Sequence, residues 1–360
     1  MAQKRQPRIN SLEWLEWKFP TEESARKLFE RLVWPEGAHC PHCGSAEVWR
    51  FREKGRKSRP GLYECRHCAG QFTVTTKTPM HATKLPLKVW LRAIYLILFS
   101  SKGVSSVILG KQLGVRQPTA WKVAHAVREM TDDRDGKDPL LGRIVEVDTT
   151  YMGAPPRKKK SKFHKHVWNP PGRGTKRPEV AVAASRDGRV AAAVVPKGDK
   201  GAIARFLDRF VARDARIMSD DDRSIAKAAK AFAAHKTVTH SQDEFARGDV
   251  HSNTVEGLAA HLKRAQLGVF HYISEMHLQR YVDELVFRRN QREVVIKQYE
   301  RDGPATLELV YRDFEIQLKD LLKRAVGRQV RRSEVGGLEW PPPIAPGYAP
   351  APSSAQIAYA

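Results

Sequence analysis

Apolar residues recur along the chain at two different spacings. Over residues 87–100 they return every three or four positions, which predicts an amphipathic helix, and residues 22–32 predict another with Thr21 as its N-cap. Between residues 140 and 300, short runs of β-type residues alternate with helical stretches. This alternation predicts an α/β layer fold for that part of the chain.

A helix-turn-helix is predicted just before this region. One helix is expected over about 105–113, followed by a turn at Gly114 and a second helix that begins near Pro118. Gly110 either weakens the first helix or lets the two helices approach closely. The first residues of such a second helix reach base edges in the major groove. The side chains expected to contact DNA are Arg116, Gln117, Thr119, Lys122 and Arg128. An ordinary helical hairpin with solvated Lys and Arg is the alternative.

The four cysteines form two pairs, and two residues separate the members of each pair: Cys40, Cys43, Cys65 and Cys68. Four thiolates at this spacing can surround one structural Zn²⁺. Two disulfides, a redox pair or four unrelated cysteines are the alternatives, and His42 and His67 are further possible ligands.

The residues around the cysteines predict a small β-ribbon. Gly44 and Gly70 follow the pairs and let the chain turn with φ > 0. Residues 71–75 predict a strand of the same ribbon.

The charge balance indicates a polyanionic partner. Lys and Arg number 63 against 40 Asp and Glu, which gives a formal net charge of +23. Neutralised phosphates release counterions, so nucleic acid is favoured over an anionic membrane or mere solubility. The segment 157–177 has nine Lys or Arg and no acid, which predicts a loop that follows DNA or, alternatively, a solvated loop.

The chain shows neither a secretory signal nor an apolar run of membrane-spanning length. Its longest apolar stretch, residues 89–99, is interrupted by Arg92, and a spanning helix needs about 20 apolar residues. We therefore expect a cytoplasmic protein associated with the nucleoid, with no membrane partner.

Carboxylates interrupt the predicted α/β region. In the strand-like segment 144–151, Val145 and Val147 face one side, so Glu146 and Asp148 face the other. A carboxylate inside a strand is costly unless it is paired or bound to a metal. Glu146 is therefore expected either to pair with a base or to join such a site.

Two later acids complete a possible metal site. Asp220 ends a predicted strand, and Glu256 lies on a helix that begins near residues 251–253. Three carboxylates could supply the hard oxygen ligands of two-metal phosphoryl transfer. Lys263 shares the helix face of Glu256 and could grip a DNA phosphate or simply be solvated. Asp222 is better explained as the N-cap of a helix over 223–234.

Taken together, these motifs resemble prokaryotic insertion-sequence transposases of the ISXO-like group, over residues 20–292. The resemblance implies a ribonuclease-H-like DDE domain whose catalytic acids are Asp148, Asp220 and Glu256. It also implies two Mg²⁺ or Mn²⁺ ions per active site, one structural Zn²⁺, and a basic position at Lys263. Thr149 departs from the group, which often has glutamate there.

The predicted fold class is α/β, a ribonuclease-H-like domain preceded by a zinc ribbon and a helical module. The expected parts are an N-terminal basic tail and helix (1–36), the zinc ribbon (37–80), the helix-turn-helix module (81–135), the catalytic domain (140–300), a helical extension (301–335) and a disordered Pro/Ala-rich tail (336–360).

The predicted function is transposition. The enzyme would bind the terminal inverted repeats of an element and its target in double-stranded DNA, and would cleave and transfer strands with Mg²⁺. The resemblance also implies a homo-oligomer, because two ends must be joined. The alternatives are a DNA-binding regulator without catalysis and a nuclease of the same fold.

Overall fold

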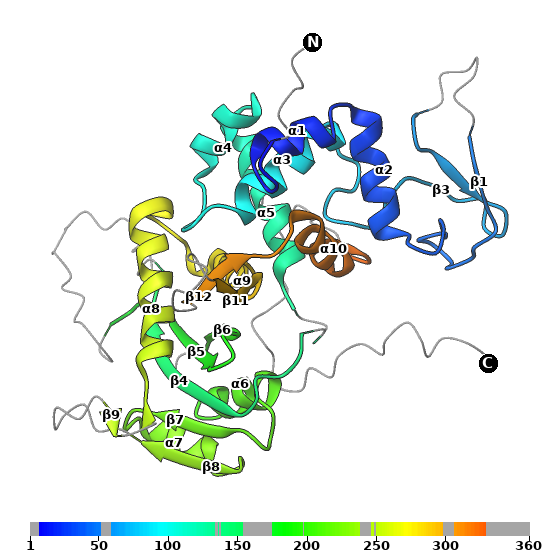
Figure 1. Ribbon diagram of the computed structural model, residues 1–360. Coiled ribbons are helices and arrows are strands. Elements are labelled where there is room, and N and C mark those ends of the chain that lie inside the picture. Colours follow the sequence, from blue (N-terminus) through cyan, green and yellow to red (C-terminus); the bar gives the residue numbers. More distant parts are fainter. Residues whose placement is uncertain are drawn as a thin grey trace, which may run out of the picture. The chain divides into compact units, whose positions relative to one another are not determined.

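The computed structural model describes residues 7–51, 59–133, 136, 138–153, 175–196, 198–237, 246–247, 250–297 and 306–328. The chain divides into two compact units, residues 1–131 with 311–339 and residues 132–310 with 340–360 (Figure 1). Most of the basic segment 157–177 and all of the tail 336–360 lie outside the described residues.

The first unit is mainly helical. Its helices are α1 (Leu12–Lys18), α2 (Glu22–Val33), α3 (Leu87–Leu98), α4 (Ser106–Leu113), α5 (Gln117–Thr131) and α10 (Phe314–Ala325). Thr21 caps α2 as predicted, because its hydroxyl accepts the N–H of Ser24 at 3.1 Å while the Ser24 hydroxyl accepts the N–H of Thr21. No helix of the part of the chain described here is both long and apolar enough to cross a bilayer.

Helices α4 and α5 form the predicted helix-turn-helix. Gly114 ends α4 in the left-handed conformation, with φ at 67°. A Cβ atom on Gly110 would lie only 3.0 Å from the carbonyl oxygen of Val115 and 3.5 Å from the Cβ of Ala120. Gly110 therefore allows the two helices to approach closely, which was one of its two predicted roles.

The C-terminal helix α10 belongs to the core of this first unit. Phe314 is completely buried, and its ring centroid lies 5.6 Å from that of Tyr95 and 6.1 Å from that of Phe99. The extension 301–335 is not wholly helical, since β12 (Thr306–Tyr311) precedes α10. Helix α10 is thus packed against helices α2, α3 and α5, which lie far earlier in the chain.

A small antiparallel ribbon lies between α2 and α3 in the sequence. Its strands are β1 (Val48–Arg50), β2 (Tyr63–Cys65) and β3 (Gln71–Phe72), in the order β1-β2-β3. The predicted strand over 71–75 stops after Phe72, because the N–H of Thr73 bonds to the Thr76 hydroxyl at 2.9 Å and starts a turn. Trp34, at the end of α2, packs edge-on against the rings of Tyr63 and Phe72.

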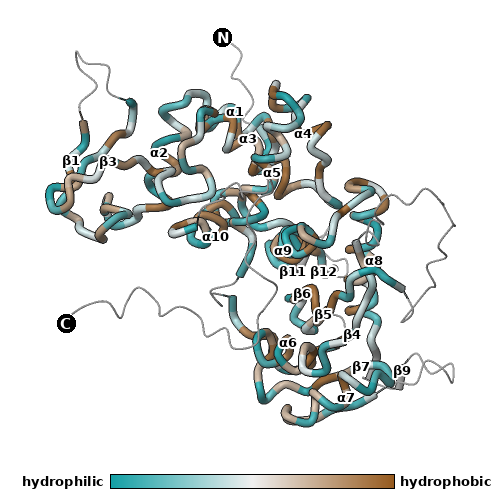
Figure 2. Tube along the Cα trace, turned by 180° about the vertical axis from the view of Figure 1, so that it is seen from behind, coloured by the Kyte–Doolittle hydropathy of each residue, from teal (hydrophilic) through white to brown (hydrophobic). Residues whose placement is uncertain are grey.

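The second unit is built on a five-stranded mixed sheet with the order β6-β5-β4-β7-β8. Its strands are β4 (Ile144–Tyr151), β5 (Glu179–Ser185), β6 (Val190–Val195), β7 (Arg216–Ser219) and β8 (Ala234–Thr237). Strands β4, β5 and β6 are antiparallel neighbours, whereas β7 and β8 run parallel to β4. The strands β5 and β6 carry long apolar stretches (Figure 2).

Helices cover both faces of this sheet. One face packs on α6 (Ala202–Phe210) and α7 (Arg223–Ala229) through Val145, Val147 and Phe206. The other packs on α8 (Asn253–Ala265) and α9 (Glu275–Asn290) through residues such as Val182.

Helix α7 stops five residues short of its predicted end, because the chain must turn into β8. The remaining elements are β9 (Ala246–Arg247), β10 (Val250–His251), the π-helix Gln266–Phe270 and β11 (Arg292–Lys297), which pairs with β12.

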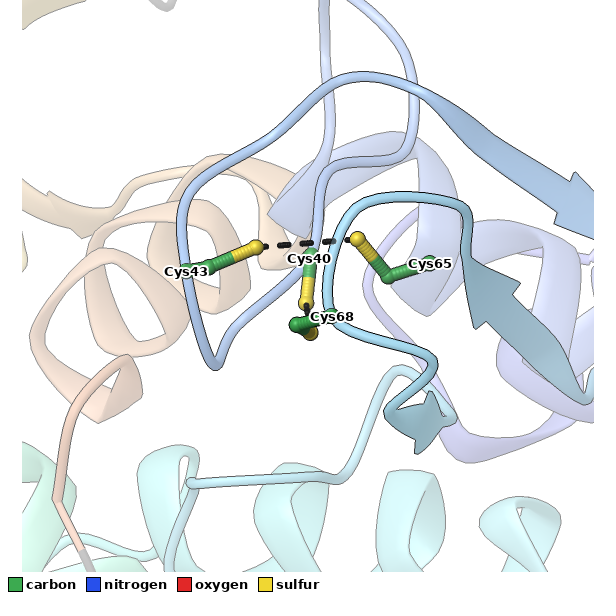
Figure 3. A group of neighbouring side chains, drawn as sticks. All are labelled: Cys40, Cys43, Cys65 and Cys68. Atoms are coloured by element: carbon green, nitrogen blue, oxygen red, sulfur yellow. Dashed lines mark hydrogen bonds between the residues drawn. The ribbon is translucent and has the colours of Figure 1, made fainter.

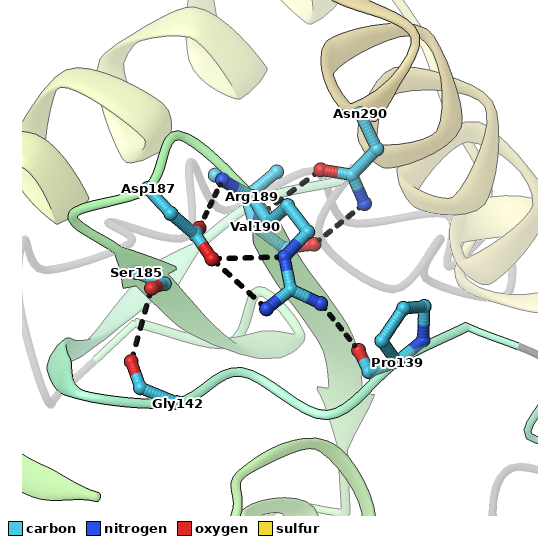
Figure 4. Close-up of polar contacts among 7 residues, drawn as sticks. All are labelled: Pro139, Gly142, Ser185, Asp187, Arg189, Val190 and Asn290. Carbon is cyan, nitrogen blue, oxygen red and sulfur yellow. Dashed lines mark hydrogen bonds and ion pairs between the residues drawn. The ribbon is translucent and has the colours of Figure 1, made fainter.

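Polar side chains fix the outer edge of the sheet (Figure 4). The Asn290 amide at the end of α9 accepts the N–H of Val190 at 2.8 Å and donates to its carbonyl at 2.9 Å. In the β5–β6 turn, Arg189 pairs with Asp187 and donates to the carbonyl of Pro139 at 3.0 Å. Strand β6 therefore has a backbone position satisfied by a side chain rather than left open to another strand.

Candidate functional site

Strand register places Asp148, within β4, level with Asp220, which directly follows β7. Strands β4 and β7 are parallel neighbours, and their last paired residues are Val147 and Ser219. Asp148 and Asp220 each follow by one residue, and both side chains are half-buried. Adjacent parallel strands lie about 4.8 Å apart, so the two carboxylates leave the sheet side by side.

Glu256 approaches the same end from helix α8. It lies in the first turn of α8, where its side chain is exposed. The Ser252 hydroxyl donates to its Oε1 at 2.8 Å. Helix α8 packs on β4 and β5, with Val255, Leu258 and Leu262 buried in the core beneath it.

The electrostatics of Asp148 show that these acids are close together. Burial raises the pKa of Asp148 from 3.8 to about 6, and the negative charges of Asp220 and Glu256 add to the rise. The N–H of Thr149, 2.7 Å from Oδ1, and the charge of Lys263 act in the opposite direction. Like charges gathered at a half-buried position are costly without a cation, and they are typical of functional sites.

Asp220 is distinguished from the two acids that follow it. Its Oδ1 accepts the N–H of Asp222 at 3.1 Å. Asp222 is the N-cap of α7, as predicted, because its Oδ1 accepts the N–H of Ser224 at 2.7 Å. Asp221 is exposed. The negative charge of Asp220 contributes to the raised pKa of Asp148.

The donor set fits a hard divalent cation. Carboxylate oxygens are the protein ligands that Mg²⁺ prefers. Among the described residues, no three acids have ligand oxygens within 4.8 Å of one another. Two ions about 3.5–4 Å apart need a wider arrangement of ligands than one ion does. Asp148, Asp220 and Glu256 are the residues that could hold such ions here.

The four cysteines form a much tighter cluster (Figure 3). Their sulfur atoms all lie within 4.8 Å of one another, and the Cys40–Cys68 and Cys43–Cys65 pairs are 3.6 Å apart. A disulfide is about 2.05 Å long, whereas sulfurs around a tetrahedral Zn²⁺ lie about 3.8 Å apart. The four thiolates could therefore bind one Zn²⁺.

The glycines beside the cysteines have different roles. Gly44 has the predicted positive φ, at 81°, but after the second pair it is Ala69 that turns, with φ at 54°. A Cβ atom on Gly70 would lie 2.9 Å from the His42 ring and 3.2 Å from the Cys68 sulfur. Gly70 is therefore required for close packing inside the ribbon and not for the turn, so this detail of the prediction was wrong.

Four of the five predicted DNA-contacting residues in the helix-turn-helix are accessible. Arg116, Gln117 and Lys122 are exposed and Thr119 is partly exposed, all at the start of α5 or just before it. The prediction that Arg128 contacts DNA does not fit the structure, because only 2% of this residue is exposed. It lies on the second half of α5, which packs against α10. The sequence pattern of α5 alone did not reveal that this face is covered.

Glu146 is a site residue that the predicted set of acids did not include. It is completely buried in β4 and pairs with Arg186 at 3.3 Å, so the expected pairing with a base is present. Its carboxylate also accepts hydrogen bonds from the first turn of α8. The available signal was its position two residues before Asp148 on the same face of the strand.

The fold and the site together define a class of protein. A mixed sheet of this order, covered on both faces by helices, with one acid on its central strand β4 and another directly after the parallel neighbour β7, is a ribonuclease-H-like domain of the DDE class. The sequence comparisons show which known domains the chain is similar to. Residues 139–290 match the ISXO2-like transposase domain, and residues 20–71 match the transposase zinc-ribbon domain. The chain thus carries a region similar to the transposase zinc ribbon followed by a region similar to the ISXO2-like transposase domain, the arrangement of an insertion-sequence transposase.

A curated relative agrees with this assignment. An uncharacterized protein in transposable element ISH50 of Halobacterium salinarum is 24% identical over 291 residues, which is 75% of this chain and 92% of the relative.

Among solved structures, the chain is similar to Mos1 transposase. The paired-end complex with the left transposon end is 15% identical with a TM-score of 0.19, over 56% of this chain and 76% of that one. The Mos1 strand transfer complex is 16% identical with a TM-score of 0.20, over the same shares of the two chains.

Proposed function

We propose that this transposase binds the ends of its element in double-stranded DNA and catalyses divalent-metal-dependent strand cleavage and strand transfer. Asp148, Asp220 and Glu256 would hold Mg²⁺ or Mn²⁺. The observation that carries the proposal is the parallel register of β4 and β7, which places Asp148 level with Asp220; consistent with their proximity, the charges of Asp220 and Glu256 add to the burial that raises the pKa of Asp148 to about 6. Three acids from β4, the end of β7 and α8 that repel one another are the arrangement a cation would stabilise.

The residues of the site have separate tasks. When bound, two ions activate an attacking water or 3′-hydroxyl and stabilise the leaving oxygen. Asp148, within β4, and Asp220, directly after the parallel strand β7, would provide neighbouring ligands from the sheet. Glu256 would complete the set from α8. Lys263 is exposed farther along the same helix, where it could contact a backbone phosphate.

DNA binding is proposed for the first unit. Arg116, Gln117, Thr119 and Lys122 would face the major groove from the start of α5, as in other helix-turn-helix proteins. The net charge of +23 supports contact with the phosphate backbone. The zinc ribbon would stiffen this unit. Because transposition joins two ends, we also propose that more than one copy of the chain assembles on DNA.

The test is a strand-transfer assay on DNA that carries the element ends, with Mg²⁺, comparing the parent with Asp148→Asn and Asp220→Asn. Asp221→Asn is a matched control, because it removes the charge of the exposed neighbour of Asp220. We expect the first two variants to bind DNA normally but to lose cleavage by about 10³-fold, equivalent to about 4 kcal/mol. The control should keep the activity of the parent.

Other results would change the assignment. Cleavage by the parent without joining would indicate a nuclease of the same fold. Site-specific DNA binding without any cleavage would indicate a regulator. Full activity of Asp148→Asn would exclude the proposed metal site.

A further inference from the structure

The buried carboxylate of Glu146, in the middle of strand β4, caps the N-terminus of helix α8. Oε2 of Glu146 accepts the N–H of Thr254 at 2.7 Å and the N–H of Val255 at 3.1 Å. Oε1 accepts the Thr254 hydroxyl at 3.0 Å and pairs with Arg186 at 3.3 Å. These two N–H groups lie in the first turn of α8, where no carbonyl of the helix can reach them.

The residue in the usual capping position does something else. Ser252 is the N-cap of α8, but its side chain makes no capping hydrogen bond. Its hydroxyl donates instead to Oε1 of Glu256 at 2.8 Å. Serine at this position ordinarily accepts an N–H of the first turn. Because Glu146 satisfies those groups, the Ser252 hydroxyl is available to orient Glu256.

The same carboxylate links two of the proposed metal ligands. Glu146 and Asp148 are two positions apart on β4, so they project from the same face about 6.7 Å apart along the strand. Thr254 and Val255, which Glu146 anchors, directly precede Glu256 on α8. The negative charge of Glu146 also lies at the positive end of the α8 dipole.

We propose that Glu146 is a positioning residue that holds the first turn of α8 on strand β4. Together with Ser252, it sets the place of the Glu256 carboxylate relative to Asp148 and thereby the affinity of the site for a divalent cation. The proposal rests on the proposed function, in which Asp148 and Glu256 share that cation.

A purely structural role is the competing explanation, and helix α6 provides the control for it. Asp199 precedes α6, its Oδ1 accepts the N–H of Gly201 at 2.9 Å, and its other oxygen pairs with Arg205. Like Glu146, it is a carboxylate that binds a helix start and an arginine. Helix α6, however, packs on the opposite face of the sheet from α8. Asp199→Asn therefore removes a similar interaction from the other side of the same domain.

The experiment measures Mn²⁺ binding to the full chain, with zinc retained in the ribbon, by electron paramagnetic resonance titration. Loss of residues that orient metal ligands typically weakens binding about 10–100-fold. We expect a loss of this size for Glu146→Gln and for Ser252→Ala.

Hydrogen–deuterium exchange then separates the capping of α8 by Glu146 from the orientation of Glu256 by Ser252. Glu146→Gln should accelerate exchange of the Thr254 and Val255 amides, whereas Ser252→Ala should leave those amides protected. Asp199→Asn should bind Mn²⁺ as the parent does.

Thr254→Val gives a milder test if Glu146→Gln does not fold. It removes only the hydroxyl bond to Oε1 and should weaken Mn²⁺ binding several-fold. The proposal is overturned if Glu146→Gln, or Thr254→Val in its place, binds Mn²⁺ within twofold of the parent while Asp148→Asn does not bind it. Parental Mn²⁺ affinity in Asp148→Asn would overturn the metal site itself, and this proposal with it.

Discussion

At the scale of single residues, Asp148 is the acid of the proposed metal site whose pKa is clearly raised. Its pKa of about 6 in the folded protein lies above the ordinary value of 3.8. Folding therefore favours the protonated form, and the stability linked to that proton is complete below about pH 4. This stability is lost as the pH rises through 6, and the loss amounts to about 3 kcal/mol at most. At neutral pH the carboxylate is ionised at a cost that a bound cation would remove.

This cost predicts an unusual stabilising variant. In the absence of divalent cations, Asp148→Asn should be more stable than the parent by about 1–3 kcal/mol at pH 7.5, because asparagine cannot ionise. The advantage should shrink at pH 4.5, where the parent is largely protonated. Urea unfolding at the two pH values measures it, and added Mg²⁺ should stabilise only the parent. An advantage of equal size at both pH values would show that ionisation of Asp148 is not its cause.

At the scale of elements, helix α10 packs against helices of the first unit that come much earlier in the sequence. Phe314 is fully buried against Tyr95 and Phe99, and Glu315 pairs with Lys18 and with Arg31. The ion pairs are partly exposed and contribute little. The apolar contacts of the buried ring should therefore account for most of the stability that α10 adds.

Removing that ring provides the test. Phe314→Ala should destabilise the first unit by about 3–5 kcal/mol, the usual cost of deleting a buried aromatic side chain. Ile316→Ala is the matched control in the same helix, because Ile316 is 42% exposed, and should change stability by less than about 0.5 kcal/mol. Urea unfolding monitored by circular dichroism compares the two. Similar losses from both variants would mean that α10 is not anchored through its buried face.

Features that depend on neighbouring residues could be predicted from the sequence, whereas contacts between residues far apart in the chain could not. The helix-turn-helix and the strand Ile144–Tyr151 were predicted correctly because their signals, periodicity and a turn glycine, lie within a few residues. The contact of Glu146 with Thr254 spans 108 positions, and that of Arg324 with the carbonyl of Thr131 spans 193. Such contacts depend on how elements pack, so neither the capping of α8 nor the burial of Arg128 was visible in the local pattern.

At the scale of the whole molecule, each of the two units has its own core, and only the first contains the cysteine cluster. A zinc ion held by the cysteines and a cation held at the proposed metal site should therefore stabilise different parts of the chain. The ribbon is not isolated within its unit, because the Trp34 ring at the end of α2 lies 5.3 Å from the Tyr63 ring and 5.8 Å from the Phe72 ring. Loss of the ribbon would expose that side of α2.

Zinc removal should consequently unfold more than the ribbon but less than the chain. With a chelator selective for Zn²⁺ over Mg²⁺, we expect hydrogen exchange to accelerate across residues 37–80 and at the end of α2, because the binding energy of a structural zinc contributes directly to folding. The strands β4 and β5 should keep their protection, since their contacts lie within the second unit. A Cys65→Ser variant should reproduce the pattern without the chelator. Equal loss of protection in both units would mean that they fold as one cooperative body, and unchanged exchange in the ribbon would mean that the cysteines hold no structural metal.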